Sequence, residues 1–211
     1  MMNKNEFDKS KKGRELPLME SFLSIQGEGF FAGKSSYFLR IGGCDVGCHW
    51  CDVKESWDPE LHPYTKVDDI ISQIKEYSVE IIVITGGEPL MWNLDYLCQR
   101  LKEMNLQIHL ETSGAYKLSG KFDWICLSPK KGVNPLQEIY DSANELKVII
   151  FNKKDLQWAI KQKNSVNQSC KLYLQPEWSK KNKIIPTIVE FIANNNEWTI
   201  SLQTHKYLNL P

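Results

Sequence analysis

The feature that most constrains the fold is the alternation of short apolar runs with longer stretches of helical periodicity. The apolar runs are rich in β-branched and aromatic residues, and they predict strands at residues 37–41, 81–84, 107–111, 124–127, 146–150, 172–174 and 198–202. Helical patterns stand between several of these runs and begin at residues 67, 93, 154 and 184. Near-continuous apolar strands that alternate with helices are typical of a parallel sheet covered by helices, so the sequence predicts an α/β fold.

Polar and glycine-bearing motifs follow the predicted strands at their carboxyl ends. A cysteine-rich segment follows the first strand, and the later strands lead into TGGEP, ETSG, SPKK, QPEW and QTHK. In a barrel of parallel strands, this end carries the functional site. A chain of 211 residues has too few strand–helix units for a complete eightfold barrel. We therefore expect an incomplete parallel (β/α) barrel, forming one domain over residues 1–211 with a flexible polar tail over residues 1–15.

The charge balance and the absence of long apolar segments narrow the possible partners. Lys plus Arg and Asp plus Glu each number 26, so no net charge attracts nucleic acid or an anionic membrane. No run of about 18 apolar residues predicts a membrane span, and the N-terminus lacks the apolar segment of a secretory signal. We therefore expect a cytoplasmic protein without nucleic-acid or membrane partners, in a reducing compartment where disulfide frameworks are rare.

The segment GCDVGCHWCD places Cys44, Cys48 and Cys51 within eight positions. A zinc site is one possibility, with His49 or His62 as the fourth ligand, although zinc sites usually combine two pairs of ligands. The other is an iron–sulfur cluster held by three thiolates, which leaves one iron open to a small molecule. The remaining cysteines are scattered singly, and we expect them to be small buried hydrophobic residues: Cys98, Cys126 and Cys170.

The spacing Cys-x₃-Cys-x₂-Cys, with Trp50 before the last cysteine, resembles that of the radical S-adenosylmethionine (SAM) superfamily. The motif TGGEP at residues 85–89 adds to this resemblance, because the superfamily carries GGEP after its second strand. Two adjacent glycines also let a backbone approach a ligand closely. The resemblance implies a [4Fe–4S] cluster on the three cysteines and SAM on the fourth iron. It also implies SAM contacts from Trp50, Gly86, Gly87 and Glu88, with Glu88 holding the methionyl ammonium group of SAM.

Motifs spread over nearly the whole chain resemble one family within that superfamily, the 7-carboxy-7-deazaguanine synthases of the queuosine pathway. These motifs are SIQGEGFFAGKSSYFLRIGGCDVGCHWCD, ITGGEPL, HLETSG, SPK, LQPE and QTHKYLNLP. The resemblance implies conversion of 6-carboxy-5,6,7,8-tetrahydropterin to 7-carboxy-7-deazaguanine with loss of ammonia. In this reaction, a radical derived from SAM takes hydrogen from the pterin and later returns it, so no side chain acts as a nucleophile.

The family resemblance also assigns roles to individual positions. The residues expected to line the SAM site are Ser128, Pro129, Lys130, Gln175, Pro176 and Glu177. Those expected to contact the pterin are Ile25, Gln26, Gly27, Glu28, Arg40, Thr85, His205 and Pro211. Arg40 would hold the substrate carboxylate, for which its planar guanidinium is suited. Pro211 would bind the guanidine-like edge of the pterin through a terminal carboxylate, since the family ends at such a proline.

One position departs from the family pattern. Family members place Thr or Ser two residues after the last cysteine, where the hydroxyl helps to hold Mg²⁺, and this chain has Val53 there. Substrate, water and a backbone carbonyl would then have to hold the ion, or Asp52 would replace the missing ligand. Alternatively, Lys54 would supply the positive charge.

Two other functions remain open from the sequence. One is a radical SAM activase of another enzyme, which the QGEG and QTHK segments disfavour because an activase needs no pterin pocket. The other is a zinc-stabilised binding module, which would give TGGEP no purpose. The family resemblance further implies an electron donor such as flavodoxin or ferredoxin, and a homodimer.

Overall fold

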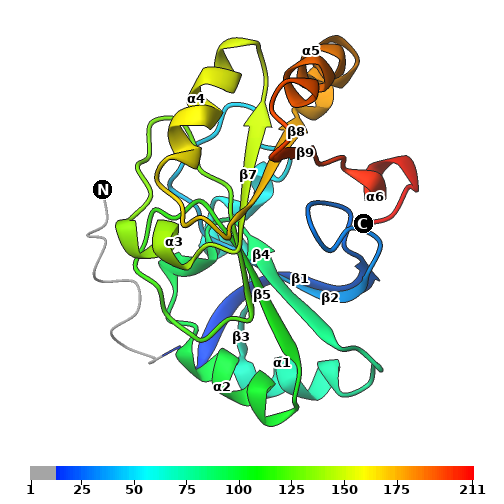
Figure 1. Cartoon of the computed structure of the whole chain (residues 1–211). Coiled ribbons are helices and arrows are strands. Elements are labelled where there is room, and N and C mark those ends of the chain that lie inside the picture. The colour runs from blue at the N-terminus through cyan, green and yellow to red at the C-terminus, as the bar shows by residue number, and fades with distance from the viewer. Residues whose placement is uncertain (1–12) are drawn as a thin grey trace.

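The computed structural model describes residues 13–211 and arranges them around one nine-stranded sheet (Figure 1). The strands are β1 (Glu15–Ile25), β2 (Ser35–Ile41), β3 (Tyr64–Lys66), β4 (Ile81–Gly86), β5 (Gln107–Thr112), β6 (Trp124–Leu127), β7 (Glu145–Ile150), β8 (Lys171–Pro176) and β9 (Trp198–Ile200). The helices are α1 (Val67–Ile74), α2 (Asp95–Glu103), α3 (Gln137–Ser142), α4 (Lys154–Lys163), α5 (Lys181–Ala193) and α6 (Thr204–Tyr207). Short 3₁₀ turns cover Lys54–Ser56, Pro59–Leu61, Pro89–Met91 and Trp178–Lys180.

The strand order is β3-β1-β2-β4-β5-β6-β7-β8-β9. Every neighbouring pair from β2 to β9 is parallel, which confirms the predicted parallel sheet. The sheet stays open, because β3 and β9 form its two edges. The last predicted strand, 198–202, ends at Ile200, and the predicted helices beginning at residues 93 and 184 begin at Asp95 and Lys181.

The sequence did not predict β1 and β3, which pair antiparallel at one edge of the sheet. In β1, the register shifts between Leu18 and Glu20, so the alternation of buried and exposed side chains is interrupted. Pro17 also weakens a strand prediction there, although it pairs with Tyr64 near the sheet edge. Most of the predicted tail lies outside the described residues, and Glu15 pairs with Lys66 in the sheet.

The two faces of the parallel strands have different chemistry. In β7, Leu146, Val148 and Ile150 are fully buried in the hydrophobic core that the helices complete. Glu145 and Lys147, which alternate with them along the strand, are buried too but point to the opposite face. An apolar face packs against the helices, while the opposite face carries polar groups under the carboxyl ends of the strands.

The cysteine-rich loop after β2 is fixed to the turn after β4 by backbone hydrogen bonds. Gly87 N donates to Ile41 O at 2.8 Å, and Glu88 N donates to Gly43 O at 2.8 Å. A Cβ atom on Gly87 would lie 2.2 Å from Gly43 O, which is far inside van der Waals contact. The glycine motif therefore lets two backbone segments meet, in addition to any approach to a ligand.

We expect Gly87→Ala to destabilise the fold by about 1–3 kcal/mol, because the methyl group must push the cysteine loop away. Urea unfolding of the cluster-free chain measures this loss, and iron content after reconstitution should fall with it. Gly132→Ala is the matched control. Gly132 has a φ of 88° but open space around it, so its cost should be limited to backbone strain of about 1 kcal/mol. Equal stability of Gly87→Ala and the parent would contradict the close approach.

Candidate functional site

A cavity of about 480 Å³ opens at the carboxyl ends of the parallel strands. Its size lies within the usual range of small-molecule sites. Of the residues that the sequence assigns to the site, Pro129 does not line this cavity. All the others do: Ile25, Gln26, Gly27, Glu28, Arg40, Cys44, Cys48, Trp50, Cys51, Thr85, Gly86, Gly87, Glu88, Ser128, Lys130, Gln175, Pro176, Glu177, His205 and Pro211.

The three clustered cysteines are free thiols on one loop, each of them partly exposed. The loop is held by two backbone bonds, from Gly43 N to Ser56 O at 2.7 Å and from Cys44 N to Trp57 O at 3.0 Å. Burial raises the pKa of Cys44 to about 11, and negative charge on Cys48 and Cys51 adds to the rise. Since metal binding needs thiolates, loading this site must displace protons.

The arrangement of these thiols fits a cluster better than a single zinc ion. Among residues 13–211, no three His, Cys, Asp or Glu side chains converge closely enough to hold one metal ion. His62 Nε2 lies 2.8 Å from Glu55 O, and the His49 ring lies 5.4 Å from the Phe151 ring. In a [4Fe–4S] cluster, each cysteine binds a different iron, so the sulfur atoms need not converge on one point. The other cysteines, Cys98, Cys126 and Cys170, are buried, as predicted.

Glu88, in the GGEP motif, is 1% exposed and joins the ends of two strands. Its Oε1 accepts from Thr112 Oγ1 at 2.6 Å and from Leu90 N at 3.1 Å. Its Oε2 accepts from Ser113 N at 2.7 Å and also from Ser113 Oγ. These four donors occupy the acceptor capacity of a carboxylate. The predicted hold on an ammonium group would therefore fall to neighbouring backbone carbonyls or require one donor to move.

Further residues predicted for the SAM side come from the loop after β6 and from the carboxyl end of β8. Lys130 Nζ donates to Ser128 O and Ser128 Oγ, both at 2.6 Å, and lies 5.6 Å from the centre of the Trp50 ring. Gln175 Oε1 accepts from Ser201 Oγ at 2.8 Å. Burial lowers the pKa of Lys130, while charge on Cys48 opposes that change. A positive charge thus stands beside the cysteine loop.

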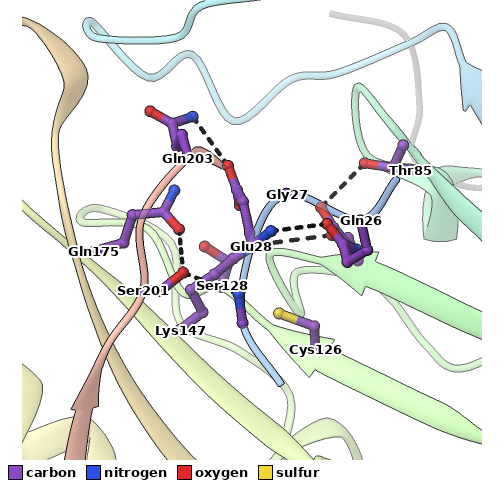
Figure 2. A network of polar contacts seen from close by, with 12 residues as sticks. Gln26, Gly27, Glu28, Thr85, Cys126, Ser128, Lys147, Gln175, Ser201 and Gln203 are labelled. Atoms are coloured by element: carbon purple, nitrogen blue, oxygen red, sulfur yellow. Dashed lines mark hydrogen bonds and ion pairs between the residues drawn. The ribbon is translucent and has the colours of Figure 1, made fainter. Parts of the chain in front are cut away.

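The predicted pterin side of the cavity is built on the loop between β1 and β2, which turns beneath the C-terminal segment (Figures 1 and 2). Gln26 Nε2 donates to Glu111 Oε1 at 3.1 Å, and Thr85 Oγ1 donates to Glu111 Oε2 at 3.3 Å. Glu28 forms an ion pair with Lys147 at 2.5 Å and accepts from Gln203 Nε2 at 2.9 Å. Two buried or half-buried carboxylates therefore organise the polar groups on this side of the cavity.

The C-terminal segment docks on the same loop. Thr204 N and Thr204 Oγ1 both donate to Gly27 O at 2.9 Å. A Cβ atom on Gly27 would lie 2.0 Å from His205 Nδ1, so only glycine allows this approach. Leu210 N donates to His205 O at 3.0 Å, which folds the segment back so that Pro211 lines the cavity.

Arg40 also lines the cavity, but its guanidinium already has an acidic partner. Its Nε donates to Glu20 Oε1 at 2.5 Å, across the antiparallel pairing of β1 and β2. The guanidinium carbon lies 5.8 Å from the centre of the Phe22 ring. A substrate carboxylate would have to bind through the two terminal nitrogens.

Several lining residues were not predicted from the sequence, and Lys147, Gln203 and Lys206 are the most informative. Lys147 carries a signal in the sequence, because a lysine interrupts the otherwise apolar run LKVII. Gln203 and Lys206 belong to the QTHK segment, where only His205 was assigned. Their partners are distant in sequence, so spacing alone does not identify their contacts.

The surroundings of Val53 do not fit a magnesium ion held by the protein. Its side chain has no oxygen, and its carbonyl accepts from Ser56 N at 3.1 Å and from Ser56 Oγ at 2.7 Å. Asp52 Oδ2 pairs with Lys206 Nζ at 2.5 Å. Mg²⁺ requires near-octahedral oxygen ligands, which this arrangement does not offer. Lys54 does not line the cavity, whereas Lys206, the partner of Asp52, does.

Within residues 13–211, none of the helices has the length and apolar character needed to cross a membrane.

Comparisons with known proteins agree with the geometry of the site. Residues 39–134 match the model of the Radical SAM superfamily. The chain is 58% identical to the 7-carboxy-7-deazaguanine synthase of Flavobacterium psychrophilum, over 95% of each chain. It is 47% identical to the enzyme of that name from Synechocystis sp., over 92% of this chain and 93% of the relative.

The crystal structure of QueE from Escherichia coli has the same fold. It superimposes with a TM-score of 0.81 at 27% identity, covering 93% of this chain and 100% of that one. This match confirms the predicted incomplete (β/α) barrel of the radical SAM type. From its full-length relatives and its cysteine-bearing cavity, the chain belongs to the 7-carboxy-7-deazaguanine synthase family of the radical SAM superfamily.

Proposed function

We propose that this chain converts 6-carboxy-5,6,7,8-tetrahydropterin to 7-carboxy-7-deazaguanine with release of ammonia. The observation that carries the proposal is the lining of one cavity by the three free cysteines together with the QGEG and QTHK segments. The β1–β2 loop and the C-terminal segment thus meet the cysteine loop in one place. Relatives named 7-carboxy-7-deazaguanine synthase align over more than nine-tenths of their length, which supports the same assignment.

In this proposal, the residues of the chain hold, orient and shield the reactants. The cluster and SAM, when bound, supply the one-electron chemistry that removes hydrogen from the substrate. Cys44, Cys48 and Cys51 would hold the cluster. Lys130, whose ammonium lies beside Trp50, would stand next to SAM. Enclosure by the barrel face limits which bond a reactive species can reach.

The pterin would lie between the β1–β2 loop and the C-terminal segment. Gln26, Thr85 and Glu28 offer hydrogen-bonding groups there, and His205 lies against Gly27. Burial lowers the pKa of His205, while the nearby Glu28 carboxylate opposes that change. Arg40 would bind the substrate carboxylate while Glu20 holds its Nε. An electron donor such as flavodoxin or ferredoxin and a homodimeric state stay predictions from the family resemblance.

The two alternative functions are less well supported. An activase would leave the polar network around Glu28 and Glu111 without a purpose. A zinc-stabilised module would require side chains that converge on one ion, which the described residues do not provide.

The first prediction from the proposed function concerns the cluster. We expect Cys51→Ala to fold but to lose cluster iron and all turnover, because two thiolates cannot hold the cluster in place. Anaerobic reconstitution followed by iron, sulfide and zinc analysis measures the cluster, and mass spectrometry of the deazaguanine product measures turnover. The control is Cys170→Ala, which removes a buried thiol outside the cavity lining and should keep both.

Two outcomes in the parent chain would contradict the proposed reaction. If the reduced enzyme cleaves SAM but leaves the carboxytetrahydropterin unchanged, the activase function gains support. If the chain binds zinc and assembles no cluster, the binding-module function does.

The second prediction concerns magnesium. Because Val53 and Asp52 do not form a magnesium site, we expect equal turnover of the parent in metal-free buffer and in buffer with Mg²⁺. Mn²⁺ titration followed by electron paramagnetic resonance should find no bound ion at this position. Val53→Thr, which restores the hydroxyl, is the comparison variant. A rate that rises with Mg²⁺ in the parent, together with a bound Mn²⁺ signal, would overturn this expectation.

A further inference from the structure

Lys147 is the least expected residue in the cavity. It lies on β7, on the strand face opposite to the core residues Leu146 and Val148, and its side chain is 4% exposed. A lysine is almost never this buried without a charged partner. Its Nζ lies 2.5 Å from Oε2 of Glu28, which is shown with Lys147 in Figure 2. It also lies 3.7 Å from Glu111 Oε1, so one ammonium stands between two carboxylates.

Each of these carboxylates in turn fixes other groups of the cavity. Glu111 accepts from Gln26 Nε2 and from Thr85 Oγ1. Glu28 accepts from Gln203 Nε2, while its own backbone N–H donates to Gln26 Oε1 at 3.1 Å. All these contacts are made by Glu28 and Glu111, the two carboxylates next to Lys147. Together they link the β1–β2 loop, β4, β5 and the C-terminal segment.

The charges around Lys147 determine the protonation states of Glu28 and of Lys147 itself. Burial alone would raise the pKa of Glu28, but the Lys147 ammonium and its hydrogen bond lower it to about 2. The pKa of Lys147 is itself raised well above its ordinary value, because nearby anionic groups outweigh its burial. The titratable and charged groups that face the pair from the surrounding elements are Glu111, Cys126, Glu145, His205 and Lys130.

Two roles for Lys147 can be compared on this basis. A covalent role needs a neutral amine, and the surrounding anions keep the nitrogen protonated. A purely structural role would be filled as well by a neutral residue, and buried ion pairs often are replaceable in this way. Lys147 differs from a simple buried pair, because its second carboxylate is held at a distance and both carboxylates line the cavity.

We propose that Lys147 is a positioning residue, whose buried ammonium keeps Glu28 as a carboxylate, holds Glu111 beside it and so fixes a hydrogen-bond-accepting edge in the substrate cavity. Ionised carboxylates only accept hydrogen bonds. This edge therefore suits a ligand that presents N–H donors, such as the amide and amine edge of a reduced pterin. The inference rests on the proposed function for the identity of that ligand, but the role of Lys147 in ionisation can be measured without it.

The test uses Lys147→Met, which keeps an unbranched side chain one atom shorter and removes its charge. Without the ammonium, burial should raise the pKa of Glu28 into the range where it is partly protonated. We expect KM for the carboxytetrahydropterin to rise about tenfold or more at neutral pH, with a smaller change in kcat. The ratio of variant KM to parent KM should grow further as pH falls, because protonation removes an acceptor.

Lys102→Met is the matched control. Lys102 lies on α2, outside the cavity lining, and pairs with Asp123 with 39% of its side chain exposed. Its removal should leave KM and its pH dependence unchanged. SAM cleavage without pterin, and the spectrum of the reduced cluster, should be the same in both variants and the parent.

A second measurement does not depend on turnover. In the parent, the depressed pKa of Glu28 contributes stability above the unfolded value of 4.5, and this contribution is lost as pH falls toward about 2. In Lys147→Met, the pKa of Glu28 is expected to lie above its unfolded value. The dependence of stability on pH is then reversed, and stability is lost as pH rises above the unfolded pKa. The difference in Tm between parent and variant should therefore widen from acid to neutral pH.

The double variant Lys147→Met with Glu28→Gln separates charge from packing. It removes both members of the closest ion pair, so we expect the widening of the Tm difference with pH to disappear. If Lys147→Met does not fold but the double variant does, the charge role is supported. If neither folds, or if Lys147→Met changes neither KM nor the pH dependence of Tm, the proposal is wrong.

The outcomes also separate this inference from the proposed function. A parent chain that does not convert the carboxytetrahydropterin would refute the function, while the Tm comparison would still decide the role of Lys147. A parent chain that turns over normally, together with an unaffected Lys147→Met variant, would refute the inference alone.

Discussion

The site depends first on Glu88, because this buried residue, just after β4, connects the end of β5 with the loop after β2. Its backbone N–H binds Gly43 O in the loop after β2, and its side chain binds Thr112 and Ser113 at the end of β5. A buried carboxylate must be fully hydrogen-bonded, so the three segments have little freedom to separate. The cysteine loop is thereby positioned by the sheet and not only by its own turns.

The site uses two different ways of burying a carboxylate. Glu88 is stabilised by neutral donors on neighbouring strands, an arrangement that suits a fixed structural junction. Glu28 is stabilised mainly by an ammonium on a strand far away in the sequence, with Gln203 as a further donor. The first lies under the cysteine loop and the second on the proposed pterin side. The two modes of stabilisation suit their regions. The junction under the cysteine loop has to stay rigid, and the proposed pterin side has to keep hydrogen-bond acceptors available for a ligand.

The sequence predicted the parts of the site that are local or follow regular strands. The cysteine spacing, the GGEP turn and the parallel strands β2 and β4 to β8 depend on neighbouring residues and on periodic burial, which a sequence displays directly. The bulge in β1 breaks that periodicity, so the antiparallel edge was missed. The hydrogen-bond partners of Glu88 were missed for a similar reason, because its donors Thr112 and Ser113 come from the next parallel strand.

The C-terminal segment forms one wall of the cavity, with Gln203, His205, Lys206, Leu210 and Pro211 in its lining. This wall illustrates why long-range polar contacts are difficult to predict from a sequence. Thr204 binds Gly27 O, Gln203 binds Glu28, and Lys206 binds Asp52, so each contact joins residues more than 150 positions apart. Little of this wall is hydrophobic core, since Tyr207, Leu208 and Leu210 stay substantially exposed. Its position therefore depends on the loop and the cysteine segment already being in place. We therefore expect changes at Asp52 or Gly27 to affect substrate binding without disturbing the hydrophobic core.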